Sequence, residues 1–444
     1  MRKNKLITGT LILTAAGFAS RFIGFFYRIF LSRMFSAEQM GIYELINPIL
    51  ALCYALCTSG IQNAISKYTA SCIGPDAKNR QLRVLLSGLY FSLFLSAGYS
   101  FAVYRFSDQI AQNLLMEERC APLLRIIALS FPAACVHSCI NGYYYGTHKT
   151  ELPAFCQLVE QIFRVGSVFL FWQYSITHPV TFRISAAAVG LVIGEVVSAV
   201  LSIVLTWIHF TFHTGAAAFA GFRKADFSPL SLLIFALPLT FNRVCLNLLS
   251  AAEAAWIPVK LTQYGFTDAE ALSVYGTLTG MAMTCIFFPT AMTNSVAVLI
   301  MPLVSSADAG KNRDYLKRLI LKCSFFCLSI GFVCMLFFYI AGLPLGNLLF
   351  HNADAGHFIR SLSFLCPFLY LNTTLFSVQN GLGKTGLTFF ANLCAIGIRL
   401  FFVFFCIPAL GVSGYLYGLF VSQIFVTLFH LFTLGRFFSK ISDS

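Results

Sequence analysis

Several arginines lie inside stretches of sequence that are otherwise strongly apolar. A charged side chain at the centre of a bilayer costs at least about 2.5–3.5 kcal/mol on insertion scales, so it normally faces a protein interior or a watery cavity. A guanidinium donates paired hydrogen bonds from a planar fork, which suits phosphate. These side chains therefore predict sites for an anionic ligand. They are Arg21, Arg28, Arg125, Arg164, Arg243 and Arg399.

The first apolar stretch carries two of these arginines on one face. Gly17, Arg21, Gly24 and Arg28 follow a spacing of i, i+4, i+7 and i+11, which aligns them along a helix. The glycines would let a bulky group approach both guanidiniums. The alternative is that Arg28, near the outer end, or the deeper Arg21 extends to the membrane interface.

The stretch 228–256 has a comparable polar face, with Asn247 one turn beyond Arg243. Glu253 lies further along and off that face. Two interpretations of Glu253 remain open: a protonatable site that couples transport to an ion, or a partner for a cation elsewhere in the fold.

The other intramembrane acids also allow two roles. Glu160 precedes Arg164 by four residues, the favourable order for an ion pair on one helix. Arg399 has no such neighbour. Glu44 and Glu195 could each neutralise an arginine or carry a proton. Among the histidines, His137, His209 and His430 are single residues on apolar stretches, which is typical of satisfied interior side chains.

The composition indicates a membrane protein with many spans. Hydrophobic residues make up 58% of the 444 residues and charged residues 11%, against about 45–50% and about 25% in globular domains. The chain predicts about twelve helices, each long enough to cross about 30 Å of hydrocarbon. The predicted spans are 6–32, 41–66, 84–105, 121–145, 153–174, 185–211, 228–256, 270–302, 318–342, 357–381, 387–407 and 411–435.

The distribution of loop charges predicts the orientation. Lysines and arginines concentrate in alternate loops, which predicts that both termini lie in the cytoplasm. The expected location is the plasma membrane. The net charge of +13 is thereby explained without nucleic-acid binding, for which no module is present. The segment Asn380–Thr385 resembles the end of a phosphate-binding loop, but Val378 stands where that motif needs glycine, so ATP binding is excluded.

The chain also repeats itself at an offset of about 230 residues. Gly146 and Lys149 with Arg164 fifteen residues later match Gly381 and Lys384 with Arg399. A Gly-x3-Gly-x3-Ser pattern, which allows close helix packing, occurs at 190–198 and again at 414–422. We therefore expect two six-helix lobes, 1–211 and 228–444, joined by a cytoplasmic linker at 212–227 and related by a pseudo-two-fold axis along the membrane normal.

Local motifs resemble a known group of membrane proteins. They are Gly9–Leu13, Arg21-x2-Gly-Phe-x2-Arg28, Gly41–Tyr43, Gly60–Lys67 and Ala236–Thr240 with Arg243. This sequence resembles the stage V sporulation protein B group, in the polysaccharide-transporter branch of the MOP exporter superfamily, alongside lipid II flippases and MATE drug exporters. The resemblance implies a V-shaped transporter with two lobes that alternates access and flips a polyprenyl-pyrophosphate-linked saccharide to the outer leaflet.

The chain departs from that group in two respects. Lipid II flippases carry an arginine in the second helix, and none occurs near Cys53 and Tyr54. Sporulation-type members and lipid II flippases usually have fourteen spans, whereas this chain predicts twelve, the number in MATE exporters.

From these residues we expect a flippase for a lipid-linked cell-envelope saccharide. Two alternatives remain: a MATE-like exporter of drugs or metabolites coupled to H+ or Na+, and a non-transporting scaffold for envelope assembly. No enzymatic activity, catalytic residue, metal or cofactor is expected, and the expected partners are the lipid-linked substrate and membrane lipids. The expected substrate-binding residues are Arg21, Arg28, Arg164, Arg243, Asn247 and Arg399, and the expected ion-coupling residues are Glu44, Glu195 and Glu253.

Overall fold

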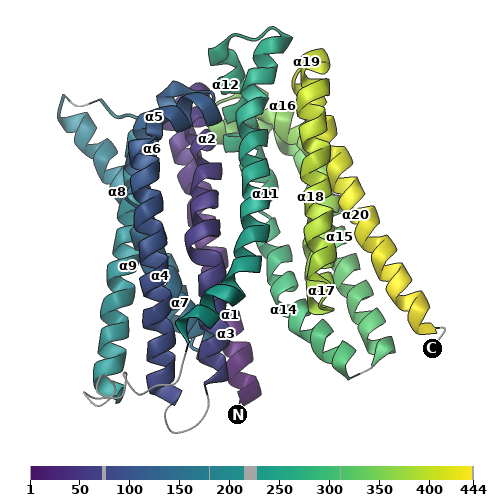
Figure 1. Ribbon diagram of the computed structural model, residues 1–444. Coiled ribbons are helices and arrows are strands. Elements are labelled where there is room, and N and C mark those ends of the chain that lie inside the picture. Colours follow the sequence, from purple (N-terminus) through teal and green to yellow (C-terminus); the bar gives the residue numbers. More distant parts are fainter. Residues whose placement is uncertain (1, 73–76, 180, 215–227, 311, 443–444) are drawn as a thin grey trace. The chain divides into compact units, whose positions relative to one another are not determined.

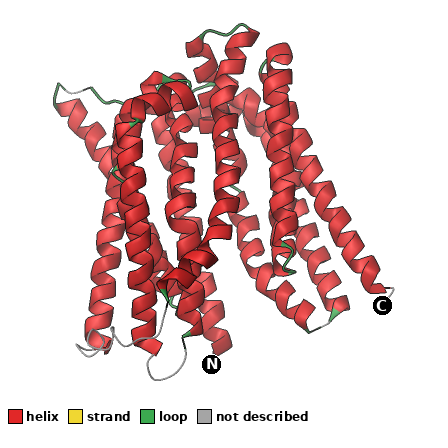
Figure 2. Cartoon of the chain, viewed as in Figure 1, coloured by secondary structure: helices red, strands yellow, loops and turns green. Residues whose placement is uncertain are grey.

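The fold is built from helices. The computed structural model of the chain describes residues 2–72, 77–179, 181–214, 228–310 and 312–442. Within these ranges, side chains are described except at 2–11, 59, 212–214 and 440–442. This part of the chain contains helices and connecting loops and no strand (Figure 2). The all-helical prediction is thereby confirmed.

The helices follow one another with short connections (Figure 1). In the first half they are α1 (Arg2–Met34), α2 (Ala37–Tyr54), the π-helical η1 (Ala55–Ser59), α3 (Gly60–Ser71), α4 (Ala77–Arg105), α5 (Ser107–Gln109), η2 (Ile110–Leu114), η3 (Glu118–Cys120), α6 (Ala121–Ala128), α7 (Phe131–Gly146), α8 (Glu151–Thr177) and α9 (Ser185–Thr214). In the second half they are α11 (Pro229–Tyr264), α12 (Asp268–Gly276), η5 (Thr277–Ala282), α13 (Met283–Phe287), α14 (Thr290–Ala309), α15 (Arg313–Phe350), α16 (Ala353–Leu362), η6 (Ser363–Leu365), α17 (Cys366–Gly381), α18 (Thr385–Phe401), η7 (Phe402–Cys406), α19 (Ile407–Leu410) and α20 (Val412–Ser442).

Helix length and composition agree with a chain that crosses the membrane many times. Within the described residues, 10 helical segments are long and apolar enough to span a bilayer, and up to 11 if a bent pair counts as one span. That pair, Glu118–Ala128 with Phe131–Gly146, bends by 49°. Pro132 stands in the first turn of the second helix, where its missing N–H costs nothing but the preceding helix cannot continue through it. The expected first span, 6–32, forms the 33-residue helix α1.

Packing divides the chain into two compact units. The first unit contains Met1–Gly24 and Leu45–Ala251, and the second contains Phe25–Glu44 and Ala252–Ser444. Helices α1, α2 and α11 therefore each contribute to both units. The predicted transport lobes, 1–211 and 228–444, stay a prediction, and residues 215–227 of the predicted linker lie outside the described residues.

The first unit is held together by apolar side chains from α3, α4, α7, α9 and α11. Ile65, Leu85 and Tyr144 are among its most buried members. Helices α3 and α7 approach so closely that a Cβ on Gly146 would lie 2.6 Å from the carbonyl oxygen of Ser66. Glycine is therefore required there to let the two backbones touch.

The second unit repeats this contact. Its core gathers apolar side chains from α14, α15, α17 and α20. A Cβ on Gly381 of α17 would lie 2.7 Å from the carbonyl oxygen of Met301 of α14. Gly381 and Met301 stand at the same sequence offset from Gly146 and Ser66, so the repeat seen in the sequence extends to a specific backbone contact in each unit.

The two Gly-x3-Gly patterns also lie at close helix contacts. In the first unit, a Cβ on Gly194 of α9 would meet the backbone oxygen of Glu160 in α8 at 3.0 Å, and α8 and α9 lie side by side. In the second unit, a Cβ on Gly418 of α20 would meet the Cβ of Phe402 in η7 at 2.6 Å. The structure confirms the close packing predicted from this pattern.

Candidate functional site

Four of the six arginines in apolar segments have carboxylate partners. Arg28 of α1 pairs with Glu44 of α2, within the second unit. Because Glu44 is buried, the negative charge that neutralises Arg28 is largely shielded from water. Arg125 of α6 donates to both carboxylate oxygens of Asp108 at 2.8 and 2.6 Å, at a more exposed position. These two guanidiniums are already matched by charge.

Arg399 has an acidic partner that its own helix could not reveal. Its Nε and Nη2 donate to the two oxygens of Glu253 in α11, at 2.7 and 3.0 Å. The hydroxyl of Tyr415 in α20 donates to the same carboxylate at 3.1 Å. The side chains of Arg399 and Glu253 are 17% and 7% exposed. Of the two roles that the sequence left open for Glu253, the structure shows the pairing with a cation.

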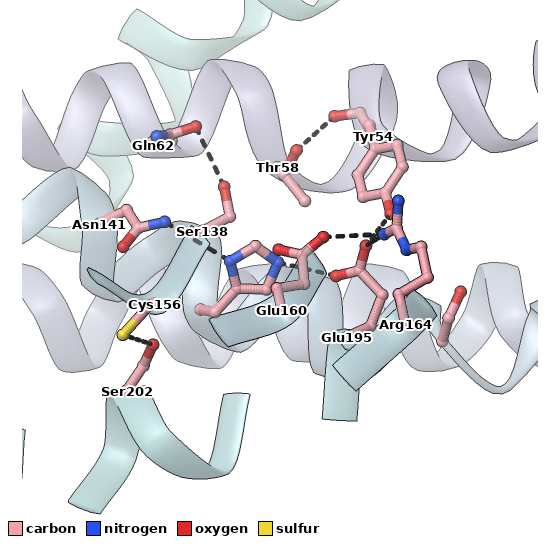
Figure 3. Close-up of polar contacts among 12 residues, drawn as sticks. Tyr54, Thr58, Gln62, Ser138, Asn141, Cys156, Glu160, Arg164, Glu195 and Ser202 are labelled. Atoms are coloured by element: carbon pink, nitrogen blue, oxygen red, sulfur yellow. Dashed lines mark hydrogen bonds and ion pairs between the residues drawn. The ribbon is translucent and has the colours of Figure 1, made fainter. Parts of the chain in front are cut away.

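A larger polar network lies in the first unit, where four helices meet (Figure 3). Arg164 donates to Glu160, its neighbour one turn earlier on α8, at 2.8 Å, which confirms the predicted ion pair. The same Nη2 lies 3.3 Å from Glu195 of α9. Glu195 also accepts a hydrogen bond of 2.6 Å from the hydroxyl of Tyr54 in α2 and lies 2.8 Å from Nε2 of His137 in α7.

Sequence reasoning missed His137 and Tyr54 as members of this network. The apolar stretch around His137 predicts an ordinary interior histidine, whereas in the structure the ring lies against a buried carboxylate 58 residues away. One local signal was available, because Asn141 follows His137 by one helical turn and its amide lies 3.5 Å from Nδ1 of the ring. His137, Glu160 and Glu195 also bring ligand atoms within 4.8 Å of one another.

Arg21 lies on an open face of α1. Its side chain is exposed, and a Cβ added to Gly17 or Gly24 on the same face would meet nothing within 4 Å. Among the described residues, no carboxylate forms an ion pair with Arg21. The face that the sequence marked as accessible to a bulky group is therefore free of packing at both glycines.

Helix α11 contacts its neighbours on either side of Arg243. On one side, a Cβ on Gly60 of α3 would lie 2.1 Å from Oγ1 of Thr240, so the two helices touch there. On the other side, Asn247 donates a hydrogen bond of 3.0 Å to the carbonyl oxygen of Ala51 in α2. All of these contacts lie within the first unit.

Helical spacing puts Thr240, Arg243 and Asn247 on one face of α11. Arg243 therefore lies at the level of the π-helical segment η1. Such segments are frequent at functional sites. The Arg243 side chain is exposed, and no described carboxylate pairs with it. Asn247, expected to bind substrate, instead uses its amide to join α11 to α2.

Comparison with known proteins identifies the family. The family described as "Polysaccharide biosynthesis protein" matches residues 6–305, which is more than half of the chain. The chain belongs to this family. Among the relatives of this family member is stage V sporulation protein B of Bacillus subtilis, 24% identical over 438 residues, covering 98% of this chain and 85% of the relative. Another is the lipid II flippase MurJ of Bacillus subtilis, 20% identical over 337 residues, covering 71% of this chain and 60% of the relative.

Solved structures show the fold of this family member. An inward-facing MATE transporter of the MOP superfamily superposes with a TM-score of 0.77 at 14% identity, covering 98% of this chain and 99% of that chain. The lipid II flippase MurJ in an inward closed conformation superposes with a TM-score of 0.72 at 15% identity, covering 96% of this chain and 87% of that chain. The resemblance drawn from the sequence motifs and the MOP-type fold are both confirmed. The chain is a multi-pass membrane protein of the transporter and flippase superfamily.

Proposed function

We propose that this protein is a flippase that moves a polyprenyl-pyrophosphate-linked saccharide from the inner to the outer leaflet by alternating access. The observation that carries the proposal is the contrast among the intramembrane arginines. Arg28, Arg125, Arg164 and Arg399 are matched by carboxylates, whereas Arg21 and Arg243 are exposed and form no ion pair with the described residues. A fixed positive charge in an apolar segment is costly unless an anion or water compensates it.

A pyrophosphate headgroup suits this arrangement. Its oxygens accept the paired hydrogen bonds that guanidinium groups donate. The open glycine face around Arg21 leaves space for a saccharide and its carrier lipid. Arg21 and Arg243 are therefore the primary substrate contacts. Arg28, Arg164 and Arg399 are secondary ones, because binding there requires a carboxylate to release its arginine first.

The names of two relatives support this proposal. One relative is a lipid II flippase and the other is a sporulation protein, which fits a cell-envelope precursor as cargo. Separately, the charge asymmetry of the loops supports cytoplasmic termini in the plasma membrane. The proposed activity makes and breaks no covalent bond and uses no ATP, so an ion gradient or the supply of substrate would drive it.

The transport test uses full-length protein in liposomes that contain a fluorescent polyprenyl-pyrophosphate disaccharide. Appearance of the label at the far leaflet is followed with a membrane-impermeant quencher. We expect Arg21→Gln and Arg243→Gln each to slow flipping about 10- to 100-fold, because each loses a charged hydrogen bond of about 1.5–3 kcal/mol.

Arg125→Gln is the matched control, because Arg125 is already paired with Asp108, and it should flip at the wild-type rate. Lysine at position 21 or 243 should recover part of the activity, since it keeps the charge and loses the fork. Wild-type rates in both Arg21→Gln and Arg243→Gln would refute the assignment.

A cation-coupled exporter of drugs or metabolites is the second candidate. The network of Glu160 and Glu195 with His137 favours it, since intramembrane acids serve as proton sites in transporters. This candidate predicts that substitutions of the acids abolish transport of cationic drugs while Arg21 and Arg243 are dispensable. The same two arginine variants therefore discriminate between the candidates.

A further inference from the structure

The network in the first unit contains more negative than positive fixed charge. Glu160 and Glu195 supply two carboxylates, and Arg164 supplies one guanidinium that contacts both. Glu195 and Glu160 are 3% and 9% exposed. With a neutral imidazole at His137, the cluster would carry a net charge of −1 in an apolar environment, where an uncompensated charge costs several kcal/mol.

Among the residues that the structure describes, Arg164 is the cation that forms ion pairs with the two carboxylates. The charged groups that act on His137 are Glu160 and Arg164 of α8 and Glu195 of α9. Helix α2 contributes the neutral hydroxyl of Tyr54, and Cys53, while η1 contributes Cys57.

The side chains of α3 and α4 that form hydrogen bonds near this network are neutral as well. Gln62 of α3 accepts a hydrogen bond from Ser138, and Ser92 of α4 donates to the carbonyl oxygen of Cys57 (Figure 3 shows Gln62 and Ser138). Protonation of Glu160 or of His137 would each bring the cluster of described residues to neutrality. Glu160 accepts a charged hydrogen bond of 2.8 Å from Arg164, which favours its ionised form, whereas Nδ1 of His137 has only a 3.5 Å contact, so the geometry favours His137.

The hydrogen bonds around the ring fit both protonation states of His137. Nε2 faces an oxygen of Glu195 at 2.8 Å, so Nε2 carries the proton in either state. Nδ1 faces the amide nitrogen of Asn141 at 3.5 Å, a long contact, while Oδ1 of Asn141 is buried and has no hydrogen-bond partner. Turning the amide by 180° would present Oδ1 to a protonated Nδ1 and satisfy both atoms.

We propose that His137 is the proton-binding site of this transporter, with Glu195 as the carboxylate that holds the charged ring and Asn141 as the amide that turns to accept from it. The proposal rests on the transport function above for the role of that proton in coupling. In the binding step, the Nδ1 lone pair forms an N–H bond with a proton from hydronium, whose O–H bond breaks to leave a water molecule. The charge of the cluster changes from −1 to zero.

This change gives the proton a conformational effect. A neutral cluster can be enclosed among helices, whereas a cluster with net charge −1 favours contact with water. Proton binding would therefore stabilise the state in which α2, α7, α8 and α9 close around His137, and proton release would stabilise a hydrated state.

A metal ion fits the cluster less well than a proton. The His137, Glu160 and Glu195 ligand atoms lie within 4.8 Å of one another, which is compatible with a transition metal. However, Nη2 of Arg164 lies against both carboxylates, at 2.8 and 3.3 Å, and its positive charge opposes a second cation. A metal or sodium ion would have to displace Arg164, whereas a proton on Nδ1 needs only the Asn141 amide to turn and leaves the contacts of Arg164 and Glu195 in place.

The direct test is 15N NMR of the full-length protein in lipid, labelled at histidine, between about pH 5 and pH 9. The 15N signal of His137 is assigned as the one that disappears in His137→Asn. If that variant misfolds, His137→Gln is used instead. We expect an imidazolium signal at low pH that converts to a neutral ring in one transition. In Glu195→Gln the cluster is neutral without the extra proton, so the imidazolium signal should be absent at pH 7.

The matched control is His430→Asn, because His430 is a buried histidine on α20, 1% exposed, with no ion pair to a described acid. It should leave the His137 signal unchanged. A His137 ring that stays neutral throughout the pH range of the folded protein would overturn the proposal. So would loss of the imidazolium signal on adding 100 µM Zn2+ or Mn2+, or on exchanging K+ for Na+.

Transport then separates this inference from the proposed function. With the fluorescent lipid-linked disaccharide, His137→Asn should abolish the dependence of flipping on a pH gradient. A titrating His137 in a protein that flips no lipid would support the proton site and contradict the flippase. Normal gradient-driven flipping with a permanently neutral His137 would support the flippase and contradict the proton site.

Discussion

The pairing of Glu253 with Arg399 predicts that Glu253 is structural. Glu253→Gln removes the negative charge and leaves the Arg399 guanidinium, only 17% exposed, without its counter-ion. The wild-type carboxylate accepts two hydrogen bonds from Arg399 at 2.7 and 3.0 Å and one from Tyr415 at 3.1 Å. Breaking a buried pair by removing one partner costs about 3–5 kcal/mol, since the other charge stays buried.

The double variant Glu253→Gln/Arg399→Gln should behave differently. It removes both charges together, so its free energy of unfolding should lie within about 1–2 kcal/mol of wild type, because replacing a whole buried pair is often close to neutral. Tyr415→Phe loses one hydrogen bond and should cost about 1 kcal/mol. Glu151→Gln, at the exposed start of α8, is the control and should change stability by less than about 0.5 kcal/mol.

The assay is unfolding by SDS titration from mixed lipid–detergent micelles, with flipping measured in parallel. The double variant should recover both stability and transport relative to Glu253→Gln. The reasoning is refuted if Glu253→Gln is as stable as wild type and the double variant still loses its response to a proton gradient. That result would make Glu253 the ion-coupling residue.

Other features of the structure give further expectations. Gly146→Leu and Gly381→Leu should each destabilise the protein by at least about 1–3 kcal/mol, because a Cβ there already meets a backbone oxygen at 2.6 or 2.7 Å. The control is Gly166→Leu, because a Cβ on Gly166 would meet nothing within 4 Å. Equal free energies of unfolding for all three variants would contradict the close contacts. At the start of α12, hydrogen bonds from the backbone N–H and hydroxyl of Thr267 lower the pKa of Glu270. This helix start should therefore keep its protection from hydrogen exchange above the ordinary glutamate pKa and lose it as pH falls through the lowered value, and Glu270→Gln should remove that pH dependence. Arg28→Gln should destabilise the protein, because it removes the guanidinium that pairs with buried Glu44. An unchanged free energy of unfolding would contradict this.

Local sequence patterns predicted the contacts that depend on residues close together along the chain. Glu160 and Arg164 are four residues apart, so helical geometry alone brings them together. The Gly-x3-Gly patterns predicted close packing because glycine spacing is itself the cause of that packing.

Local patterns could not predict the carboxylate partners that only the tertiary structure brings next to an arginine. Glu44 lies 16 residues from Arg28 and Glu253 lies 146 residues from Arg399. Nothing in a period of 3.6 residues relates these positions, so the sequence could not assign Glu44 to Arg28 or Glu253 to Arg399. The contact of His137 was equally unpredictable from local sequence, because its partner Glu195 lies on another helix. For Arg21 and Arg243 substrate binding stays a prediction, and the structure places no described carboxylate in an ion pair with either.

Binding of the lipid pyrophosphate to Arg21 and Arg243, which form no ion pair with the described residues, tests the account most directly. The dissociation constant of a polyprenyl pyrophosphate would be measured for wild type, Arg21→Gln, Arg243→Gln and the double variant, with the uncharged polyprenol as control. Each single variant should weaken pyrophosphate binding about 10- to 100-fold and leave polyprenol binding unchanged. If the double variant bound the pyrophosphate as tightly as wild type, these arginines would not be the substrate site.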